Sequence, residues 1–230
     1  MHISRKTGGR RFAVSDIHGC LRTFNDLLTK INLTPEDTLF ILGDYIDRGP
    51  DSKGVIDRIW ELEKQGFNLH CLRGNHEQMM TVTQYFPDKA SHWLRNGGQA
   101  TLDSFPGGQI PTKYYRWVDE LPYYFTTEGC ILVHAGLNFA KDDPLSDHES
   151  MIWLRYWYED IDHAWLDGRI IVHGHTPTER PTLERNLLRS DKVPAVNIDG
   201  GCVYDKKDLG WLIAFDMDKR EYIFQESTEE

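Results

Sequence analysis

The sequence predicts a single α/β domain in which helices cover two β-sheets. In the first third of the chain, short apolar runs alternate with segments of helical periodicity. In the second half, short strand candidates follow one another, separated by turns. No internal repeat or low-complexity linker divides the 230 residues, and a chain of this length can bury a core without disulfides or a structural metal.

The first third is expected to form a βαβαβ unit. Apolar runs at 11–16, 38–44 and 68–75 have the length and composition of buried strands. Between them, the segments 19–31 and 55–62 place apolar residues three and four positions apart, as an amphipathic helix does. Strands that alternate with helices in this way form a parallel sheet.

Further strand candidates follow a mixed segment at about 77–128 that contains helical patches and turns. They lie at 130–136, 169–175, 193–199, 209–218 and 221–225. The last two are expected to pair as a hairpin across Asp218 and Lys219. The domain is expected to span 1–230, with a core at about 10–216 and a frayed acidic tail at 226–230.

Composition excludes several classes of protein. The chain has 26 basic and 36 acidic residues, a net charge of −10, which disfavours nucleic acid as a partner. No apolar run is long enough to span a membrane, and the start of the chain lacks the apolar core of a signal peptide. Cys20, Cys71, Cys130 and Cys202 form no CxxC pair, so we expect reduced core thiols in a cytoplasmic protein.

Residues suited to metal binding and acid–base chemistry stand at the ends of the apolar runs. The five segments are Asp16-Ile-His18-Gly19, Gly43-Asp44-Tyr-Ile-Asp47-Arg48-Gly49, Arg73-Gly74-Asn75-His76-Glu77, His134-Ala-Gly136 and His173-Gly-His175. Ligands of open α/β sheets bind outside the carboxyl ends of the strands, so these segments should converge on one site. Each motif alone has an ordinary structural explanation, such as a turn, a helix cap or a core histidine. Their ordered recurrence at strand ends favours a functional site.

The ordered motifs DIHG, GDYIDRG, LRGNHE, LVHAG and VHGHT resemble those of the phosphoprotein phosphatases within the metallophosphoesterase superfamily, especially the short bacterial and phage members. The resemblance covers Asp16 to about Asp199. It implies a four-layer αββα sandwich of two mixed sheets. It also implies a metal-dependent phosphomonoester hydrolase of the serine/threonine protein phosphatase type, with phosphotyrosine as a further substrate. A metal-bridging hydroxide would attack the phosphorus in line.

The resemblance also implies a dinuclear metal site. It assigns Asp16, His18 and Asp44 to the first ion. Asp44 would bridge to a second ion, which Asn75, His134 and His175 complete. Carboxylate, imidazole and amide ligands without thiolate suit manganese, the expected metal, with iron, zinc or nickel as alternatives.

Five residues are assigned by resemblance to catalysis and substrate binding. His76 would be the general acid that protonates the leaving alkoxide, and Asp47 would orient its imidazole. Arg48 would clamp the phosphate together with Asn75, because a guanidinium fork matches phosphate oxygens. Arg155 is predicted to be the second clamp arginine, against the alternative of a surface arginine in an aromatic-rich helix.

Some features leave alternatives open. Thr176 stands where many metallophosphoesterases carry a second ligand histidine, which fits the protein phosphatase branch. A dinucleoside tetraphosphate hydrolase of the symmetrical type is the alternative function; Asp47-Arg48 and Glu77 look more like the protein phosphatases. A catalytically inactive phosphate-binding module is a third alternative. It is the least favoured, because all predicted ligands are present. Phosphoproteins are the expected partners, a membrane is not, and a monomer is expected although the sequence does not determine the oligomeric state.

Overall fold

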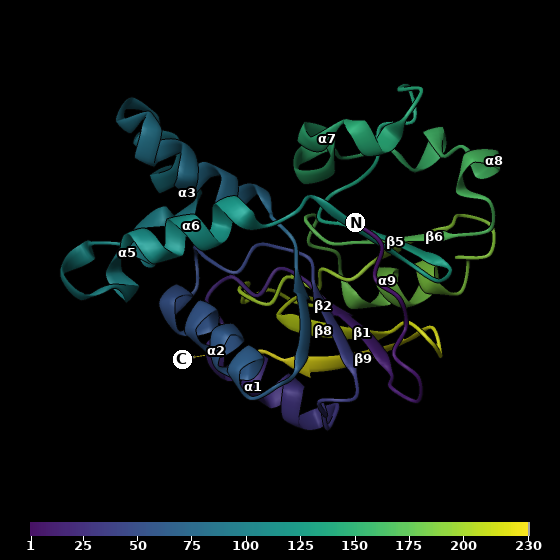
Figure 1. The fold of residues 1–230 in the computed structure, drawn as a ribbon, viewed down its shortest axis with the longest axis horizontal. Helices are drawn as coiled ribbons and strands as arrows, with labels where there is room; N and C mark the ends of the chain where they lie inside the picture. Colours follow the sequence, from purple (N-terminus) through teal and green to yellow (C-terminus); the bar gives the residue numbers. More distant parts are fainter. Residues whose placement is uncertain (230) are drawn as a thin grey trace.

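A computed structural model describes residues 1–229 of the chain. Two mixed sheets of five and four strands lie within this part of the chain, with helices on their outer faces (Figure 1). The predicted fold class is therefore confirmed.

The first sheet contains the predicted βαβαβ unit. Its strands are β1 (Arg11–Val14), β2 (Thr38–Ile41), β3 (Asn68–Cys71), β8 (Trp211–Asp216) and β9 (Glu221–Glu226). Their order across the sheet is β3-β2-β1-β8-β9, with β1, β2 and β3 parallel. β8 pairs antiparallel with both β1 and β9, which confirms the predicted hairpin.

The second sheet has the order β4-β5-β6-β7. Its strands are β4 (Tyr124–Thr127), β5 (Cys130–Val133), β6 (Ile170–His173) and β7 (Ala195–Asn197). β5, β6 and β7 are parallel and fall within predicted strands. β4 was not predicted, because it is short and lies in the segment that we interpreted as mixed; it pairs antiparallel with β5.

The α-helices cover the sheets and form one projecting group. They are α1 (Leu21–Lys30), α2 (Ser52–Lys64), α3 (Asn75–Tyr85), α4 (Ala90–Trp93), α5 (Gln99–Ser104), α6 (Thr112–Glu120), α7 (His148–Trp153), α8 (His163–Leu166) and α9 (Arg180–Leu187). In Figure 1, α1 and α2 lie against the first sheet, α7 and α8 lie beyond the second, and α3, α5 and α6 stand together to one side.

The alternation of side chains along the strands creates the four layers. In β1, Phe12 and Val14 belong to the apolar core beneath α1 and α2, whereas Ala13 belongs to the core between the sheets. In β5, Leu132 joins that central core, whereas Ile131 packs with the residues of α7 and α8. Both faces of each sheet are thus buried, which explains why the strands read as continuous apolar runs.

The expectation of a frayed tail is wrong for the described residues 226–229. The backbone N–H of Thr23 donates to the Glu229 carboxylate (2.9 Å), and the backbone N–H of Thr228 donates to the Thr23 hydroxyl (2.9 Å). The Thr228 hydroxyl also donates to Asp26 (2.8 Å). The Glu229 carboxylate thus accepts one otherwise unpaired N–H group in the first turn of α1, and Thr228 adds two hydrogen bonds to side chains of this helix, so this attachment holds the segment in place.

The structure also bears on the expectations about cysteines and membrane-spanning segments. All four cysteines are free and buried, as predicted. Among residues 1–229, no helix combines the length and the hydrophobicity that crossing a membrane requires.

Asp37 is a buried carboxylate that stabilises the turn before β2. Burial alone would raise the pKa of Asp37, but hydrogen bonds from Arg10 and Thr34 outweigh it and lower the pKa to about 2. The Arg10 guanidinium lies 2.6 Å from the Asp37 carboxylate. The ionised form of Asp37 therefore stabilises the fold above the ordinary carboxyl pKa, and this contribution is lost as the pH falls towards 2.

We expect Asp37→Asn to lower the free energy of unfolding by about 2 kcal/mol at pH 7, the value of the pKa difference. Urea denaturation at pH 7 and at about pH 3 measures it, and the gap between wild type and variant should shrink in acid. Asp142→Asn, at an exposed aspartate, is the matched control. A gap that is equal at both pH values would contradict the assigned role of the charge.

Candidate active site

Asp44 lies at the centre of the predicted site. Its Oδ2 atom is 3.6 Å from the Nε2 atom of His18, 3.9 Å from that of His76 and 3.4 Å from that of His134. Potential ligand atoms lie within 4.8 Å of one another in two groups that share Asp44: one with His18 and His76, the other with His134 and His175. A carboxylate common to two such groups is placed to bridge two ions.

The backbone fixes the orientation of two of these imidazoles. The Nδ1 atom of His18 is 2.8 Å from the carbonyl oxygen of Ile46, and that of His134 is 2.8 Å from the carbonyl oxygen of Leu42. A carbonyl can only accept, so each Nδ1 carries the proton and each Nε2 presents its lone pair towards Asp44. Neutral imidazoles held in this way are the ligands that a divalent ion requires, so the side chains present fit a metal site.

Asn75 lies between the two histidines of the second group. Its Oδ1 atom is 2.9 Å from the Nε2 of His134 and 2.9 Å from the Nδ1 of His175. The Nε2 of His175 is buried without a hydrogen-bond partner among the described residues. Burial lowers the pKa of His175 to about 2, with a further contribution from the neighbouring His134. Both imidazoles are therefore neutral and available as ligands at neutral pH.

Asp16 lies next to this group but outside both three-residue clusters. Its Oδ2 atom accepts hydrogen bonds from the Ser15 hydroxyl and from the backbone N–H of His175, the latter at 2.9 Å. Asp16 therefore ties the end of β1 to the end of β6. The structure thus brings all six predicted ligands together, and it places Asp16 less centrally than the resemblance implies.

The backbone at the site is unusual. Six of the eleven non-glycine residues with positive φ among residues 1–229 are predicted site residues, namely Asp16, His18, Asp44, Asp47, Arg48 and His175. Side chains with a Cβ are disfavoured in this conformation, and such strain concentrates at functional sites. The strand ends therefore turn sharply so that these side chains point into one site.

Two glycines allow the strand ends to approach one another. A Cβ atom at Gly174 would lie 2.1 Å from the Asp16 carboxylate, and one at Gly43 would lie 2.6 Å from the backbone nitrogen of Gly74. Gly43 also has a φ of +97°. Any larger residue would push the strand ends apart.

Glu77 holds two of the motif loops together. Its carboxylate accepts the backbone N–H groups of Asp44 (2.9 Å), Tyr45 (2.9 Å) and Gly74 (3.0 Å). It is fully buried, and burial raises the pKa of Glu77 to about 7 against the effect of these hydrogen bonds. The sequence signalled this residue only as part of the GNHE motif, and the structure shows its function as a brace for the Asp44 loop.

His76 and Asp47 form a buried pair. The Nδ1 of His76 is 2.6 Å from the Oδ2 of Asp47, while the Nε2 of His76 faces Asp44. Burial lowers the pKa of His76 well below its usual value and raises that of Asp47 to about 7, so neither holds its charge easily by itself. A direct hydrogen bond between the two lets them share a proton, and this suits a group that donates one.

Sequence reasoning missed the residues that hold Asp47. The Trp93 indole N–H donates to the Asp47 carboxylate (2.9 Å to Oδ2), and the Thr101 hydroxyl donates to its Oδ1 (2.5 Å). Both residues come from the projecting helices, far from any motif, and no pattern around them could have indicated this contact. Their hydrogen bonds fix the carboxylate that faces His76.

Arg48 and Arg155 lie beside different histidines of the site. Arg48 approaches His18, with 2.6 Å between Nη1 and the ring Nε2. Arg155 is not in a helix, since α7 ends at Trp153, and its Nη1 donates to the hydroxyl of Thr176 beside His175 (3.1 Å). The two predicted clamp arginines therefore both reach the histidine cluster.

Three further residues lie around the site. His173 is bound to the hydroxyl of Tyr158 (2.6 Å) and burial lowers its pKa to about 4, so it supports the site from outside. The ring of Tyr204 lies 5.9 Å from the Arg48 guanidinium. Asp199 is buried with one unpartnered oxygen, and burial together with Asp16 raises the pKa of Asp199 well above its ordinary value.

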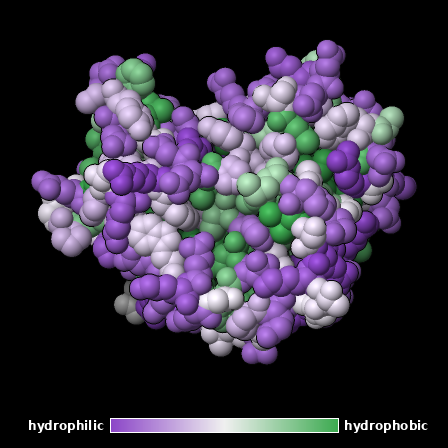
Figure 2. Space-filling model, viewed as in Figure 1, coloured by the Kyte–Doolittle hydropathy of each residue, from purple (hydrophilic) through white to green (hydrophobic). Residues whose placement is uncertain are grey.

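On the face drawn in Figure 2, apolar surface gathers near the middle, within a mostly hydrophilic surround.

Comparisons with known proteins agree with this geometry. Serine/threonine-protein phosphatase 1 of Salmonella typhimurium is 35% identical to this chain, over 88% of the chain and 91% of that protein. The asymmetrical bis(5'-nucleosyl)-tetraphosphatase PrpE of Bacillus velezensis is 25% identical over 94% of the chain and 92% of that protein. A solved protein serine/threonine phosphatase from Saccharomyces cerevisiae has the same fold, with a TM-score of 0.71 at 14% identity, covering 100% of this chain and 84% of that one.

A family model described as calcineurin-like phosphoesterase matches residues 10–200. This range contains every predicted site residue and most of the chain. The chain therefore belongs to the calcineurin-like metallophosphoesterases, a family of phosphoester hydrolases that includes bacterial serine/threonine-protein phosphatase 1.

Proposed function

We propose that this protein is a phosphomonoesterase that removes phosphate from serine and threonine residues of phosphoproteins, and that two divalent ions assist it, manganese being the expected metal. The observation that carries this proposal is the position of Asp44 Oδ2 within 3.4–3.9 Å of three imidazole Nε2 atoms, with the His76–Asp47 pair beside it. Asp16, His18 and Asp44 would hold the first ion. Asp44, Asn75, His134 and His175 would hold the second.

The chain's own residues divide the remaining work. When bound, the ions neutralise phosphate oxygens and activate water. Arg48 and Arg155 would bind the non-bridging phosphate oxygens and orient the ester for in-line displacement. His76 would donate a proton from Nε2 to the leaving oxygen, and Asp47 would stabilise the imidazolium through Nδ1. Trp93 and Thr101 would keep Asp47 in position.

Three observations favour a phosphoprotein over a dinucleoside tetraphosphate. Identity to the Salmonella protein phosphatase is higher than to the tetraphosphatase of Bacillus velezensis, 35% against 25%. The cavity that opens at Arg48 is lined by four cationic and five acidic side chains, whereas a chain of four phosphates would require a cationic surface. The buried acid at His76 also suits a serine alkoxide, which leaves only when it is protonated.

A substrate panel tests the proposal. With Mn²⁺ present, we expect kcat/KM for a phosphoserine or phosphothreonine peptide to exceed that for dinucleoside tetraphosphate by at least about ten-fold, the effect of roughly 1.4 kcal/mol in transition-state binding. A phosphotyrosine peptide completes the panel. A preference for the dinucleotide would support the alternative, a dinucleoside tetraphosphate hydrolase. No turnover of any substrate would support the inactive module.

The remaining expectations accompany this proposal. Phosphoproteins would be its partners, without nucleic acid or membrane, and we propose a monomer. The four buried free thiols favour a reducing compartment, the cytoplasm.

A further inference from the structure

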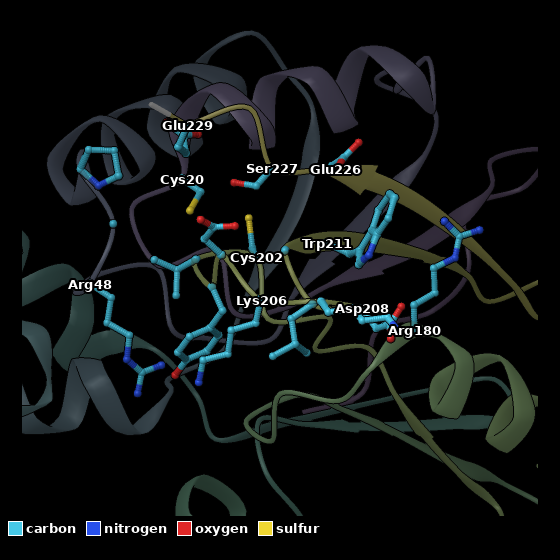
Figure 3. A pocket seen from close by; sticks show the side chains of 18 of the residues that line it. Cys20, Arg48, Arg180, Cys202, Lys206, Asp208, Trp211, Glu226, Ser227 and Glu229 are labelled. Carbon is cyan, nitrogen blue, oxygen red and sulfur yellow. The ribbon is translucent and has the colours of Figure 1, made fainter.

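A large cavity extends from Arg48 along the surface, away from the histidine cluster. Its volume is about 890 Å³, within the range of ligand-binding cavities. The loop 203–209, the start of α9 and the end of β9 line it, and Figure 3 shows Arg48 at one end and Arg180 with Trp211 at the other. Nothing in the proposed chemistry uses this space beyond Arg48.

Arg48 joins the cavity to the proposed proton donor through one imidazole, that of His18. The ring of His76 packs edge-on against that of His18, with 4.7 Å between centroids, and Arg48 contacts the same His18. The proposed proton donor and the residue at the mouth of the cavity therefore contact the same imidazole. If His76 protonates the leaving oxygen, as the proposed function requires, the group attached to that oxygen lies next to Arg48.

Arg48 and Lys206 line the end of the cavity near the site; the lining also contains the carboxylates of Asp205 and Glu229, the latter already bound to Thr23. Arg48 and Lys206 approach the same Tyr204 ring, with 5.9 Å and 5.4 Å between charge and centroid. Neither Lys206 nor Lys207 forms an ion pair within the described part of the chain, and both are exposed. Their charges are free to attract a carboxylate beside the phosphate.

The far end is negatively charged. Arg180 at this end is already engaged, because its Nε is 2.9 Å from Glu184 and its guanidinium stacks on Trp211 at 4.8 Å. Asp208 and Glu226 line the same end and form no ion pair among residues 1–229. In Figure 3 both lie on the Trp211 side of the cavity, away from Arg48 and Lys206. The cavity therefore offers a lysine without an ion pair towards Arg48 and two carboxylates without one towards Trp211.

We infer that this cavity binds the polypeptide of the phosphoprotein substrate, and that it selects an acidic side chain close to the phosphorylated residue and a basic side chain farther along. Lys206 would contact the acidic side chain, and Asp208 with Glu226 would contact the basic one. An extended peptide advances about 3.3–3.6 Å per residue, so several of its residues fit along a cavity of this size. This inference rests on the proposed function and adds the sequence preference of the substrate.

Charge-swap variants and a peptide library test the inference. The library places a single Asp or a single Lys at each position within about five residues of phosphoserine in a neutral peptide, and kcat/KM is measured as a ratio to the neutral peptide. For the wild type we expect roughly a five-fold gain for Asp near phosphoserine and for Lys at a more distant position, the size of an exposed ion pair.

Each cavity variant should change one of the two preferences, the near one for Asp or the distant one for Lys. Lys206→Glu should reverse the near preference from Asp to Lys and leave the distant one. Glu226→Lys should abolish the distant preference for Lys, and Asp208→Asn, which retains a residue tolerant of its positive φ, should weaken it. Lys64→Glu and Glu36→Lys carry the same charge changes at exposed positions outside the cavity and should keep the wild-type profile.

The outcomes separate the two proposals. A flat profile for the wild type, or equal shifts in the cavity variants and their controls, would overturn this inference while phosphoserine turnover continued. Failure to hydrolyse any phosphopeptide, with turnover of dinucleoside tetraphosphate, would overturn the proposed function and the inference with it.

Discussion

Replacement of Asp44 by Asn is expected to lower the affinity for both metal ions at once and to reduce activity by roughly a thousand-fold, because metal assistance supplies several kcal/mol of transition-state stabilisation. Asp44 Oδ2 is the one ligand atom near all three imidazoles of His18, His76 and His134. An amide is isosteric with the carboxylate but is neutral and bridges two cations poorly.

Metal analysis of the purified variant, after equilibration with Mn²⁺, measures this effect independently of turnover. Chelator-treated wild type should also be inactive and should recover when Mn²⁺ is added. Asp199→Asn is the matched control, because Asp199 is a buried carboxylate near the site but belongs to neither cluster. Two tightly held ions in Asp44→Asn would exclude the bridging role. Full activity of the metal-free wild type would exclude a metal-dependent reaction.

The sequence predicted most of the fold because the strands are buried on both faces. Phe12, Ala13 and Val14 are all apolar although they face different layers, so β1 reads as a continuous run. β4 gave a weaker signal, because Tyr124 and Thr126 are only half-buried and polar residues interrupt the pattern. The attachment of Thr228 to Thr23 was invisible, since acidic and hydroxyl residues at a chain end are typical of an exposed tail.

The positions of the proposed ligands were predictable because each follows a strand, and parallel strands end at a common edge. Two histidines illustrate this: His134 comes directly after β5, and His175 comes two residues after the end of β6. The supports of the site were not predictable in this way. Trp93 and Thr101 reach Asp47 across more than forty residues of chain, from helices that carry no motif. Only the packing of the projecting helices against the Asp47 loop brings them there.

Replacement of His76 by Asn is expected to reduce activity on a phosphoserine peptide by about 10²–10⁴-fold, the usual contribution of general acid catalysis. The loss on p-nitrophenyl phosphate should be much smaller, at most about ten-fold, because p-nitrophenolate (pKa about 7) leaves without protonation. The structure motivates this contrast by pairing His76 with Asp47 at 2.6 Å and directing its Nε2 into the site. Steady-state kinetics on the two substrates measures it.

Two further variants serve as internal comparisons. Asp47→Asn should show the same contrast more mildly, because Asp47 acts only by orienting and charging the imidazole. Arg48→Ala should weaken both substrates alike, because it binds phosphate oxygens and not the leaving group. A variant that merely disturbed the fold would affect both substrates equally and would also unfold at lower urea concentration.

The metal content of His76→Asn distinguishes a proton donor from a ligand. His76 lies in the same cluster as His18 and Asp44, so its geometry alone permits either role. A proton donor can be removed without loss of metal, and we expect the variant to retain both ions. Loss of an ion, or equal losses on the two substrates, would assign His76 to metal or phosphate binding. Asp47 would then lose its role as well, since it acts on the substrate only through the imidazole that it holds.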